Sequence, residues 1–351
     1  MREETGVPLS GLTTLRLGGP ARRLVVAESD DEVISVVRAA DAASEPLLVL
    51  GGGSNLVVAD DGFDGTVLQI ATRGVATAPD GDVPAHALQV EAGVDWDHVV
   101  ALAVHEGYAG IEALSGIPGL VGAAPIQNIG AYGQDLSQTV AWVRVLDRTT
   151  GDVVVLDNAA CRFSYRHSVF KGTSYRGGGR YVVLAVALAL EHSRIGRPVR
   201  YAELARRLGV AVGEQVPAAD VREAVLDLRR GKGMVLDAAD HDTWSAGSFF
   251  TNPVLPAEDA ARLLSEDAPR WPEADGRVKT SAAWLIERAG YGKGYGSGAV
   301  QLSGKHPLAL TNRGGATTEQ LLVLAREVRD GVRARCGVEL VNEPVLVGVS
   351  L

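Results

Sequence analysis

The chain has 351 residues, which suggests about two or three domains of ordinary size. With 46% hydrophobic and 22% charged residues, it has the composition of a globular protein with a substantial core. Its net charge of -9 argues against a general nucleic-acid surface, because binding to phosphates needs clustered cations.

The two cysteines, Cys161 and Cys336, stand far apart in the sequence, so neither a zinc motif nor a disulfide framework is expected. No stretch approaches the ~18 apolar residues of a membrane-spanning helix. The first residues have no apolar segment of the signal-peptide type. We therefore expect a cytoplasmic protein that binds no membrane, no nucleic acid and no metal.

The chain opens with the pattern of a βαβ unit. Residues 21–28 have the composition of a strand, and Ser29 with Glu32 predicts a capping box at the start of an amphipathic helix. Residues 46–50 form the next apolar strand, which ends in the loop "GGGSN". The sequence from residue 56 to residue 70 indicates extended chain and a turn and not a helix.

The remaining chain mixes strands and helices. Strands are predicted at 88–94, in a hairpin over 140–157 around Thr150 and Gly151, at 180–190 and at 338–348. Helices are predicted at 95–107, 217–231, 256–265, 280–289 and 317–335, the last with Thr317 and Gln320 in a capping box. The polar stretches 192–198 and 237–244 are the best candidates for boundaries or insertions.

Two glycine-rich segments are candidates for ligand contact. In "LGGGSN" no helix follows the glycines, so the dinucleotide-binding fingerprint does not fit, and both a phosphate-binding nest and a plain tight turn remain open. Residues 115–133 carry five glycines and two prolines with almost no charge. Such a loop either satisfies its own backbone as a buried connection or offers it to a flat aromatic cofactor.

Three polar residues stand in apolar or aromatic surroundings. Arg166 in "FSYRHSVFK" either forms a structural ion pair or binds a carboxylate. Glu343 in "VNEPVLVG" is an acid in an apolar strand, and its simplest role is to pair with Arg166 or another cation. Ser248 in "SAGSFFTNPV" taken alone favours a turn residue that bonds to its own backbone.

The order of these segments resembles the UDP-N-acetylenolpyruvoylglucosamine reductase family. The resemblance covers nearly the whole chain and rests on "TTLRLGGPA", "GGGSN", "SGIPG", "PIQNIGAYG", "YRHSVFK", "GSFFTNP" and "NEPVLVG". It implies an α+β fold: a two-part FAD-binding domain of the vanillyl-alcohol-oxidase (PCMH) type, followed by a C-terminal α+β substrate-binding domain. We expect the FAD-binding subdomains at 1–67 and 68–231, the second completed by a strand at 337–351, and the substrate-binding domain at 232–336.

The resemblance also implies the cofactors. FAD would bind non-covalently, since "GGGSN" has no His or Cys for attachment, and NADPH would be the co-substrate. The residues implied to bind FAD lie in the two glycine-rich segments, with one arginine from a predicted helix. They are Gly51, Gly52, Gly53, Ser54, Asn55, Ser115, Gly116, Ile117, Pro118, Gly122, Ala123, Gln127, Asn128, Gly130, Ala131 and Arg229.

By the same resemblance, Ser248, Arg166 and Glu343 are the catalytic residues. The implied substrate-binding residues are Tyr132, Tyr165, Tyr201, Lys232, Asn252 and His306. Tyr201 in "VRYAEL" resembles the tyrosine of a longer class with an extra substrate-covering loop. The chain departs from the family at Thr251, where lysine or arginine is usual, and in the 237–244 stretch; Lys305 is a second candidate for the role of His306.

The implied reaction is the NADPH-dependent, FAD-mediated reduction of the enolpyruvyl ether of UDP-N-acetylglucosamine to UDP-N-acetylmuramate in peptidoglycan synthesis. Hydride would come from flavin N5 and the proton from Ser248. We expect small-molecule partners and a monomer. A related FAD-dependent sugar or alcohol oxidase is the first alternative, and a non-catalytic protein that binds flavin or a sugar nucleotide is the second.

Overall fold

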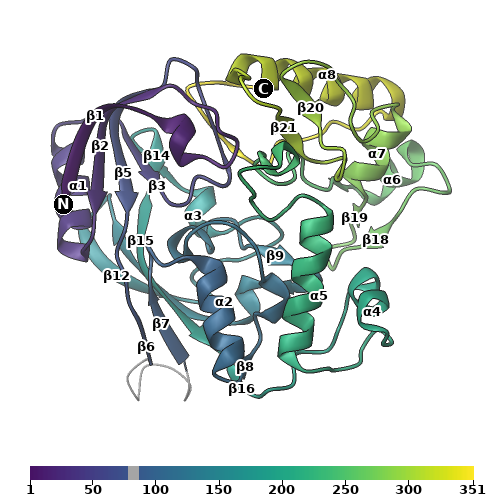
Figure 1. Ribbon diagram of the computed structural model, residues 1–351, viewed down its shortest axis with the longest axis horizontal. Coiled ribbons are helices and arrows are strands. Elements are labelled where there is room, and N and C mark those ends of the chain that lie inside the picture. The colour runs from purple at the N-terminus through teal and green to yellow at the C-terminus, as the bar shows by residue number, and fades with distance from the viewer. Residues whose placement is uncertain (78–86) are drawn as a thin grey trace. The chain divides into compact units, whose positions relative to one another are not determined.

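In the computed structural model, which describes residues 1–77 and 87–351, contacts divide the chain into two compact units (Figure 1). The first unit comprises Met1–Val7, Ala21–Gly52 and Asp64–Gly231. The second unit comprises Pro8–Pro20, Gly53–Phe63 and Lys232–Leu351. The chain therefore leaves the first unit twice before it finally enters the second at residue 232.

A four-stranded sheet in the order β1-β2-β5-β3 opens the first unit. Its strands are β1 (Arg2–Pro8), β2 (Pro20–Ala27), β3 (Leu47–Leu50) and β5 (Phe63–Ile70). The helix α1 (Asp30–Ala42) begins at Ser29, whose side chain accepts from the N–H of Glu32 as predicted. The carboxylate of Glu32 accepts from the N–H of Glu28, so the reciprocal bond lies one residue earlier than in a capping box. The βαβ pattern is confirmed with one addition: β5 lies between β2 and β3 and pairs in parallel with β3.

A five-stranded antiparallel sheet in the order β12-β11-β15-β7-β6 forms the second layer of this unit. Its strands are β6 (Val75–Thr77), β7 (Ala87–Glu91), β11 (Val140–Asp147), β12 (Asp152–Asp157) and β15 (Tyr181–Ala189). The predicted hairpin is confirmed in β11 and β12, which turn at Thr150 and Gly151. One hydrophobic core joins both sheets to α1 and to α2 (Trp96–His105), so the glycine-rich segments extend from a rigid support.

The last part of the first unit is helical. Helix α5 (Ala218–Gly231) packs beside α2 (Figure 1), and α4 (Ala202–Leu208) packs on α5. Helix α4 was not expected from the sequence. The shorter elements of this unit are β8 (Tyr108–Ala109), η2 (Glu112–Leu114), η3 (Val121–Ala123), β9 (Gly130–Ala131), β10 (Gln134–Asp135), η4 (Leu136–Gln138), α3 (Val169–Gly172), β13 (Ser174–Tyr175), β14 (Gly178–Gly179) and β16 (Glu191–His192).

The second unit packs three helices against short strands around its own core. Helix α8 (Thr318–Cys336) begins with the predicted capping box, in which Thr317 and Gln320 exchange side-chain and backbone bonds. Leu321, Leu322 and Val328 on its inner face are fully buried. The other elements are η1 (Leu9–Leu12), β4 (Leu56–Val58), η5 (His241–Thr243), β17 (Val254–Leu255), α6 (Ala257–Leu263), β18 (Trp271–Pro272), β19 (Val278–Lys279), α7 (Ala282–Arg288), β20 (Val300–Leu302), β21 (Leu310–Asn312) and β22 (Val345–Val347).

One strand groups differently from the sequence-based expectation. The segment 337–351 was expected to complete the subdomain at 68–231. In the structure β22 pairs in parallel with β4, and both strands belong to the second unit. The carbonyl of Val347 also accepts from the N–H of Ala59, which extends this attachment. Parallel pairing over three residues and the bond from Ala59 together hold this segment to β4.

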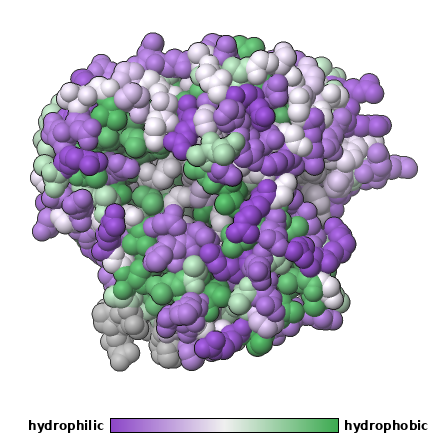
Figure 2. All heavy atoms as spheres, viewed as in Figure 1, coloured by the Kyte–Doolittle hydropathy of each residue, from purple (hydrophilic) through white to green (hydrophobic). Residues whose placement is uncertain are grey.

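The viewed surface of the molecule is mostly polar. Figure 2 shows hydrophilic residues over most of this face, with hydrophobic residues in small groups between them. Within residues 1–77 and 87–351, every helix is too short or too polar to span a bilayer.

Candidate active site

The loop after β3 brings two backbones together. A Cβ atom on Gly52 would lie 2.7 Å from the Cα of Gly119, so neither an alanine nor anything larger fits there without moving main chain. Gly53 has φ +60°, in the left-handed region that glycine favours. The loop is partly exposed, and the bare main chain of Gly51 and Gly52 suits the close approach of a phosphate. This geometry favours the phosphate-binding interpretation over the plain turn.

The segment 115–133 is held by polar side chains that lie outside it. Asp97 on α2 accepts from the N–H of Gly116 at 2.6 Å and also receives two bonds from Arg222 on α5, at 2.6 and 2.9 Å. The Arg222 guanidinium and the Gly116 N–H outweigh the burial of Asp97 and lower the pKa of its carboxyl group. Asp97 therefore stays ionised at neutral pH and fixes the start of the loop between two helices.

Two residues predicted to bind FAD also support the loop from within. Ser115 is fully buried, and its hydroxyl donates to the carbonyl of Glu112 at 2.7 Å. The Asn128 side chain accepts from the N–H of Ser137 and donates to the carbonyl of Ser164. The contacts of Ser115, Asn128 and the other residues of this loop with FAD stay predictions.

A two-residue hairpin carries Tyr132 at its tip. Strands β9 and β10 pair Ala131 with Gln134, and the two residues between them, Tyr132 and Gly133, have φ values of +50° and +88°. Two positive φ angles at these positions are what a type I′ turn requires. The turn holds the Tyr132 ring edge-on to Tyr201, with centroids 5.6 Å apart and planes at 88°. The structure thus brings together two predicted substrate residues that stand 69 positions apart by number.

Arg166 is attached to the same hairpin. Its Nη2 donates to the carbonyl of Gly130 at 3.1 Å, and its guanidinium lies 5.8 Å from the centre of the Tyr165 ring. Arg166 itself has φ +53°, an uncommon conformation for a residue with a side chain. The backbone strain and the bond to Gly130 together direct this arginine, which matches the pattern of strained residues at functional sites.

Arg229 on α5 is a buried cation that interacts electrostatically with Tyr132 and Arg166. Its side chain is 9% exposed, and burial lowers its pKa to about 10, so it is still a cation at neutral pH. Burial also raises the pKa of Tyr132 to about 12, against the opposing effect of Arg229, and this tyrosine therefore keeps its hydroxyl proton. The first unit thus presents a cationic and aromatic set suited to an anionic ligand: Arg166, Arg229, Tyr132 and Tyr201.

In the second unit, main-chain bonds join the segment of Ser248 to the segment of Glu343. The N–H of Glu343 donates to the carbonyl of Phe249 at 2.8 Å, directly after Ser248 in the chain. The N–H of Phe249 donates to the carbonyl of Leu308 at 2.7 Å, and Phe249 is 1% exposed. Ser248 is partly exposed and stands directly before Phe249, which is buried and held by these bonds. Glu343 is 9% exposed.

Thr251 has a structural role that the sequence did not suggest. Its N–H and its hydroxyl both donate to the carbonyl of Val341, at 3.0 and 3.3 Å. These two bonds to one acceptor extend the pairing of residues 249–251 with 341–343, which also includes a bridge between Phe250 and Asn342. A threonine at this position therefore stabilises the pairing between the segment of Ser248 and the segment of Glu343.

Two asparagines of the second unit are oriented by hydrogen bonds. The Asn55 side chain donates to the carbonyl of Glu343 at 3.5 Å, and its own main-chain carbonyl accepts from the N–H of Val345 at 2.9 Å. Asn55, predicted to bind FAD, thus connects the glycine-rich loop to the segment of Glu343. Asn252 accepts from the N–H of Ala282 at 3.0 Å, so its amide NH₂ group is the part that suits a ligand.

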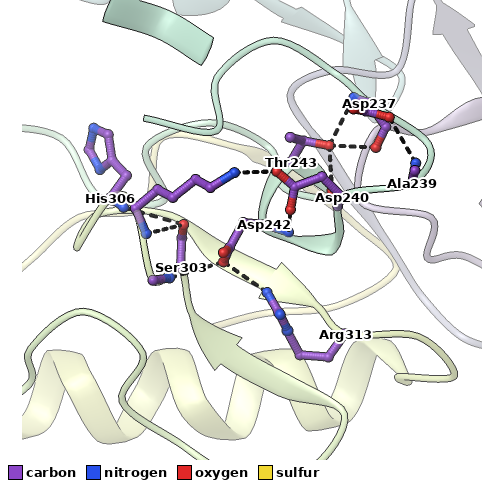
Figure 3. Close-up of polar contacts among 10 residues, drawn as sticks. Asp237, Ala239, Asp240, Asp242, Thr243, Ser303, His306 and Arg313 are labelled. Atoms are coloured by element: carbon purple, nitrogen blue, oxygen red, sulfur yellow. Dashed lines mark hydrogen bonds and ion pairs between the residues drawn. The ribbon is translucent and has the colours of Figure 1, made fainter. Parts of the chain in front are cut away.

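The 237–244 stretch is a closely bonded acidic loop (Figure 3). Thr243 lies at its centre and donates to the carbonyls of Asp237 and Asp240, at 2.8 and 2.7 Å. Asp240 forms an ion pair with Lys305. Asp242 accepts from the Arg313 guanidinium and from the N–H of Gly304, at 2.8 and 2.9 Å.

These contacts separate the two candidates at the "GKHP" turn. Lys305 is held by Asp240, which raises the pKa of the Lys305 ammonium group. In Figure 3 the imidazole of His306 points away from the acidic loop. Its Nδ1 accepts from the N–H of Leu308 at 3.0 Å, so Nε2 carries the proton of the neutral ring and is a hydrogen-bond donor. This arrangement favours His306 for ligand contact.

The glycine loops, the anion-binding set and the match of a family model define the class of the protein. A model described as "FAD binding domain" matches residues 21–157, which include the Gly51–Asn55 loop. The close approach of Gly52 and Gly119 fits such a cofactor, because glycine at position 52 lets the loop lie against the 115–133 segment with its main chain uncovered. The protein is an FAD-dependent oxidoreductase with an α+β fold, as the sequence predicted.

A second family model, described as "UDP-N-acetylenolpyruvoylglucosamine reductase, C-terminal domain", matches residues 239–347. The chain is 58% identical to UDP-N-acetylenolpyruvoylglucosamine reductase of Thermobifida fusca, over 98% of both chains. It is 56% identical to the protein of the same name from Streptomyces coelicolor, over 100% of this chain and 92% of that one. A crystal structure of UDP-N-acetylenolpyruvylglucosamine reductase from Thermus caldophilus superposes with a TM-score of 0.68 at 25% identity, over 99% of each chain. The chain belongs to the UDP-N-acetylenolpyruvoylglucosamine reductase family, which confirms the predicted membership.

The sequence patterns did not point to two residues that support the 115–133 loop. Asp97 and Glu112 hold the loop at 115–133, and neither was expected to matter. Glu112 had a visible signal, because it is an acid in the apolar run "GIEALSG", the same signal that drew notice to Glu343. Asp97 had none, since it also fits the exposed first turn of a helix.

Proposed function

We propose that the protein reduces the enolpyruvyl ether of UDP-N-acetylglucosamine to UDP-N-acetylmuramate, with NADPH as co-substrate, as a cytoplasmic monomer in peptidoglycan synthesis. The observation that carries the proposal is the 58% identity over 98% of the chain to a reductase named for this enolpyruvyl compound. FAD, when bound, supplies the two-electron redox chemistry between NADPH and the carbon–carbon double bond. The residues of this chain bind, orient and protonate the substrate.

Arg166 is assigned to the carboxylate of the enolpyruvyl group. Negative charge builds on this carboxylate as the double bond is reduced, and a guanidinium offers paired donors to it. The bond from Nη2 to Gly130 and the strained backbone support this role, because they restrict the guanidinium to one direction. Arg229 is buried and interacts electrostatically with Tyr132, so its positive charge suits the cofactor phosphates or the substrate.

Ser248 is assigned to proton donation and Glu343 to hydrogen bonding with the same carboxylate. A serine hydroxyl is a weak acid, so it serves here because the enediolate that forms on the substrate is a strong base. Glu343 must be protonated to donate a hydrogen bond, since an ionised carboxylate only accepts. The bond from the Glu343 N–H to the Phe249 carbonyl supports a joint role, because it holds the segment of Ser248 against the segment of Glu343.

The nucleotide sugar is assigned to the remaining predicted residues: Tyr132, Tyr165, Tyr201, Lys232, Asn252 and His306. The bond from Leu308 to Nδ1 of His306 supports a donor role for Nε2 toward a phosphate or a sugar oxygen. Replacing His306 with alanine should therefore raise the KM for the nucleotide sugar about tenfold, while Lys305→Met should leave it nearly unchanged.

Anaerobic stopped-flow measurement of flavin absorbance tests the proposal. NADPH should bleach the bound flavin, and the enolpyruvyl substrate should then restore the absorbance and yield UDP-N-acetylmuramate. Turnover of a simple sugar or alcohol with oxygen and without NADPH would instead establish an oxidase. Sedimentation velocity at two protein concentrations tests the monomer.

A further inference from the structure

Glu112, in the 3-10 helix η2, is a buried acid to which the proposed chemistry assigns no role. Its side chain is fully inaccessible to solvent, in a segment that packs between α2 and α5. A carboxylate so deeply buried is costly unless hydrogen bonds compensate it. Three donors do so, and each comes from a different part of the first unit.

The first donor belongs to the Tyr132 hairpin. Nε2 of Gln134, the residue directly after the turn, donates to Oε1 of Glu112 at 2.8 Å. Oε1 of Gln134 in turn accepts from the N–H of Ala113 at 2.9 Å. These two bonds fix the exit strand of the hairpin on η2, and therefore fix where Tyr132 lies at the tip.

The second donor belongs to the segment that carries Tyr201. The N–H of Arg197 donates to the same Oε1 atom of Glu112 at 2.7 Å. The adjacent Gly196 has no Cβ, which would lie 3.0 Å from Oε1, so the backbone can approach this closely. The third donor, the N–H of Gly110, occupies Oε2 at 2.6 Å.

The hairpin and the 194–201 segment also meet at their far ends. A Cβ atom on Gly133 would lie 2.9 Å from the Cβ of Arg200, so glycine at this position allows the close approach at which the rings of Tyr132 and Tyr201 meet edge-on. Behind this contact, α4 and α5 share a small core with Ala113, which adjoins Glu112. The two tyrosines are thus joined twice: directly through their rings, and at the base through one carboxylate oxygen.

We propose that Glu112 is a positioning residue, which sets the register between the Tyr132 hairpin and the 194–201 segment and thereby forms the aromatic pair for the nucleotide sugar. The inference rests on the proposed function, because it takes Tyr132 and Tyr201 as substrate contacts. Glu112 touches neither substrate nor cofactor and acts through the two tyrosines.

Glu112→Gln is the central variant. The amide matches the carboxylate in shape, but its NH₂ group must face one of three N–H donors, so at least one bond is lost. We expect the KM for the enolpyruvyl substrate to rise at least about tenfold, with flavin content and bleaching by NADPH within about twofold of wild type. Glu214→Gln, at an exposed glutamate between α4 and α5, is the matched control and should leave the KM unchanged.

A double-mutant cycle with Tyr201→Ala separates positioning from general damage. If Glu112 acts through Tyr201, Glu112→Gln adds at most about a twofold rise in KM once Tyr201 is alanine. The proposal would be overturned if the rise in KM of the double variant equals the product of the two single rises. An unchanged KM in Glu112→Gln would also overturn it. If Glu112→Gln does not fold, Gln134→Ala takes its place in the cycle, because it removes the hairpin bonds alone.

Hydrogen exchange tests the link without any substrate. Amides at 197–201 should exchange at least about tenfold faster in Glu112→Gln than in wild type, since an anchoring bond is lost. Unchanged exchange would refute the Glu112 link, even if the reductase activity is established. Faster exchange in a protein that does not convert the enolpyruvyl sugar would retain the link and refute the proposed function instead.

Discussion

Replacement of Ser248 by alanine should separate the two halves of the proposed reaction. The change removes one oxygen atom and no main-chain bond. Phe249 keeps its bonds to Leu308 and Glu343, because both use backbone groups, so the segment should stay in place. We expect the variant to fold, bind FAD and accept electrons from NADPH at close to the wild-type rate.

The expected magnitude depends on the role of the hydroxyl. A positioned general acid contributes about 10²- to 10⁴-fold to a rate, which corresponds to about 2.7 to 5.4 kcal/mol of transition-state stabilisation. The free energy of unfolding should change by less than about 0.5 kcal/mol, since Ser248 is partly exposed and its loss creates no buried cavity. The defect should therefore appear in flavin reoxidation by the enolpyruvyl substrate and not in stability.

Anaerobic stopped flow measures the two half-reactions separately, and Ser245→Ala supplies the control. Ser245 lies three residues earlier and is buried, and its hydroxyl accepts from the N–H of Gly247 at 3.2 Å. Its loss should cost about 1 kcal/mol of stability while both half-reactions proceed. Reoxidation of Ser248→Ala at the wild-type rate would refute the assignment of the proton donor. Equal slowing of both half-reactions would refute it as well, because that result indicates a general distortion.

Three further predictions concern the first unit. Arg166→Lys should slow reoxidation by the enolpyruvyl substrate about 10²-fold, because an ammonium group cannot reproduce the paired donors of a guanidinium; stopped flow measures this. Gly52→Ala should weaken FAD binding at least about tenfold, since its Cβ would meet Gly119 at 2.7 Å; the flavin-to-protein absorbance ratio reports it. Asp147→Asn should lower the free energy of unfolding by about 1 to 2 kcal/mol at pH 6, because a hydrogen bond from the partly exposed Arg180 lowers the pKa of Asp147 from 3.8 to about 2. Since the folded-state pKa is the lower one, this stabilisation is present above pH 4 and disappears toward pH 2, which urea titrations across that range would track.

Each of these predictions has a result that contradicts it. Arg162→Lys changes an exposed arginine that also has a positive φ. If it slows flavin reoxidation as much as Arg166→Lys does, the slowing is not specific to Arg166. Gly11→Ala places a Cβ where nothing lies within 4 Å, and a flavin loss as large as that of Gly52→Ala would remove the steric explanation. For Asp147→Asn, a difference from wild type in the free energy of unfolding that persists down to pH 2 would exclude ionisation of Asp147 as its cause.

Local patterns predicted most of the regular structure. Ser29 and Thr317 marked helix starts correctly, since side-chain caps act on neighbours in the sequence. The hairpin at 140–157 was predicted from its turn residues in the same way. Helix α4 was missed because seven residues give too little periodicity, and it is stabilised by packing on α5. The position of β5 between β2 and β3 depends on long-range pairing, which local patterns do not contain.

The candidate site could also be predicted only in part. The order of the motifs indicated the residues of the proposed chemistry, but not the contacts that hold them in place. The pairing of the Ser248 segment with the Glu343 segment joins residues about 90 positions apart, as the Thr251–Val341 bond shows. The positive φ of Arg166 and the type I′ turn at Tyr132 are backbone states that neither residue type favours. Such states arise from the surrounding structure, so no sequence window around either residue could have predicted them.

The interleaving of the two units has a consequence for synthesis on the ribosome. Residues 8–20 and 53–63 leave the exit tunnel early, yet their partners in the second unit come after residue 232. The bond between Asn55 and Glu343 spans 288 positions and cannot form until translation has passed residue 343. The first unit can complete its sheets before the second unit is synthesised. Residues 8–20 and 53–63 then lack their partners until about 120 further residues have been translated. We expect ribosome-bound chains that are halted after residue 231 has left the exit tunnel, but before residue 343 has, to engage chaperones through these loops.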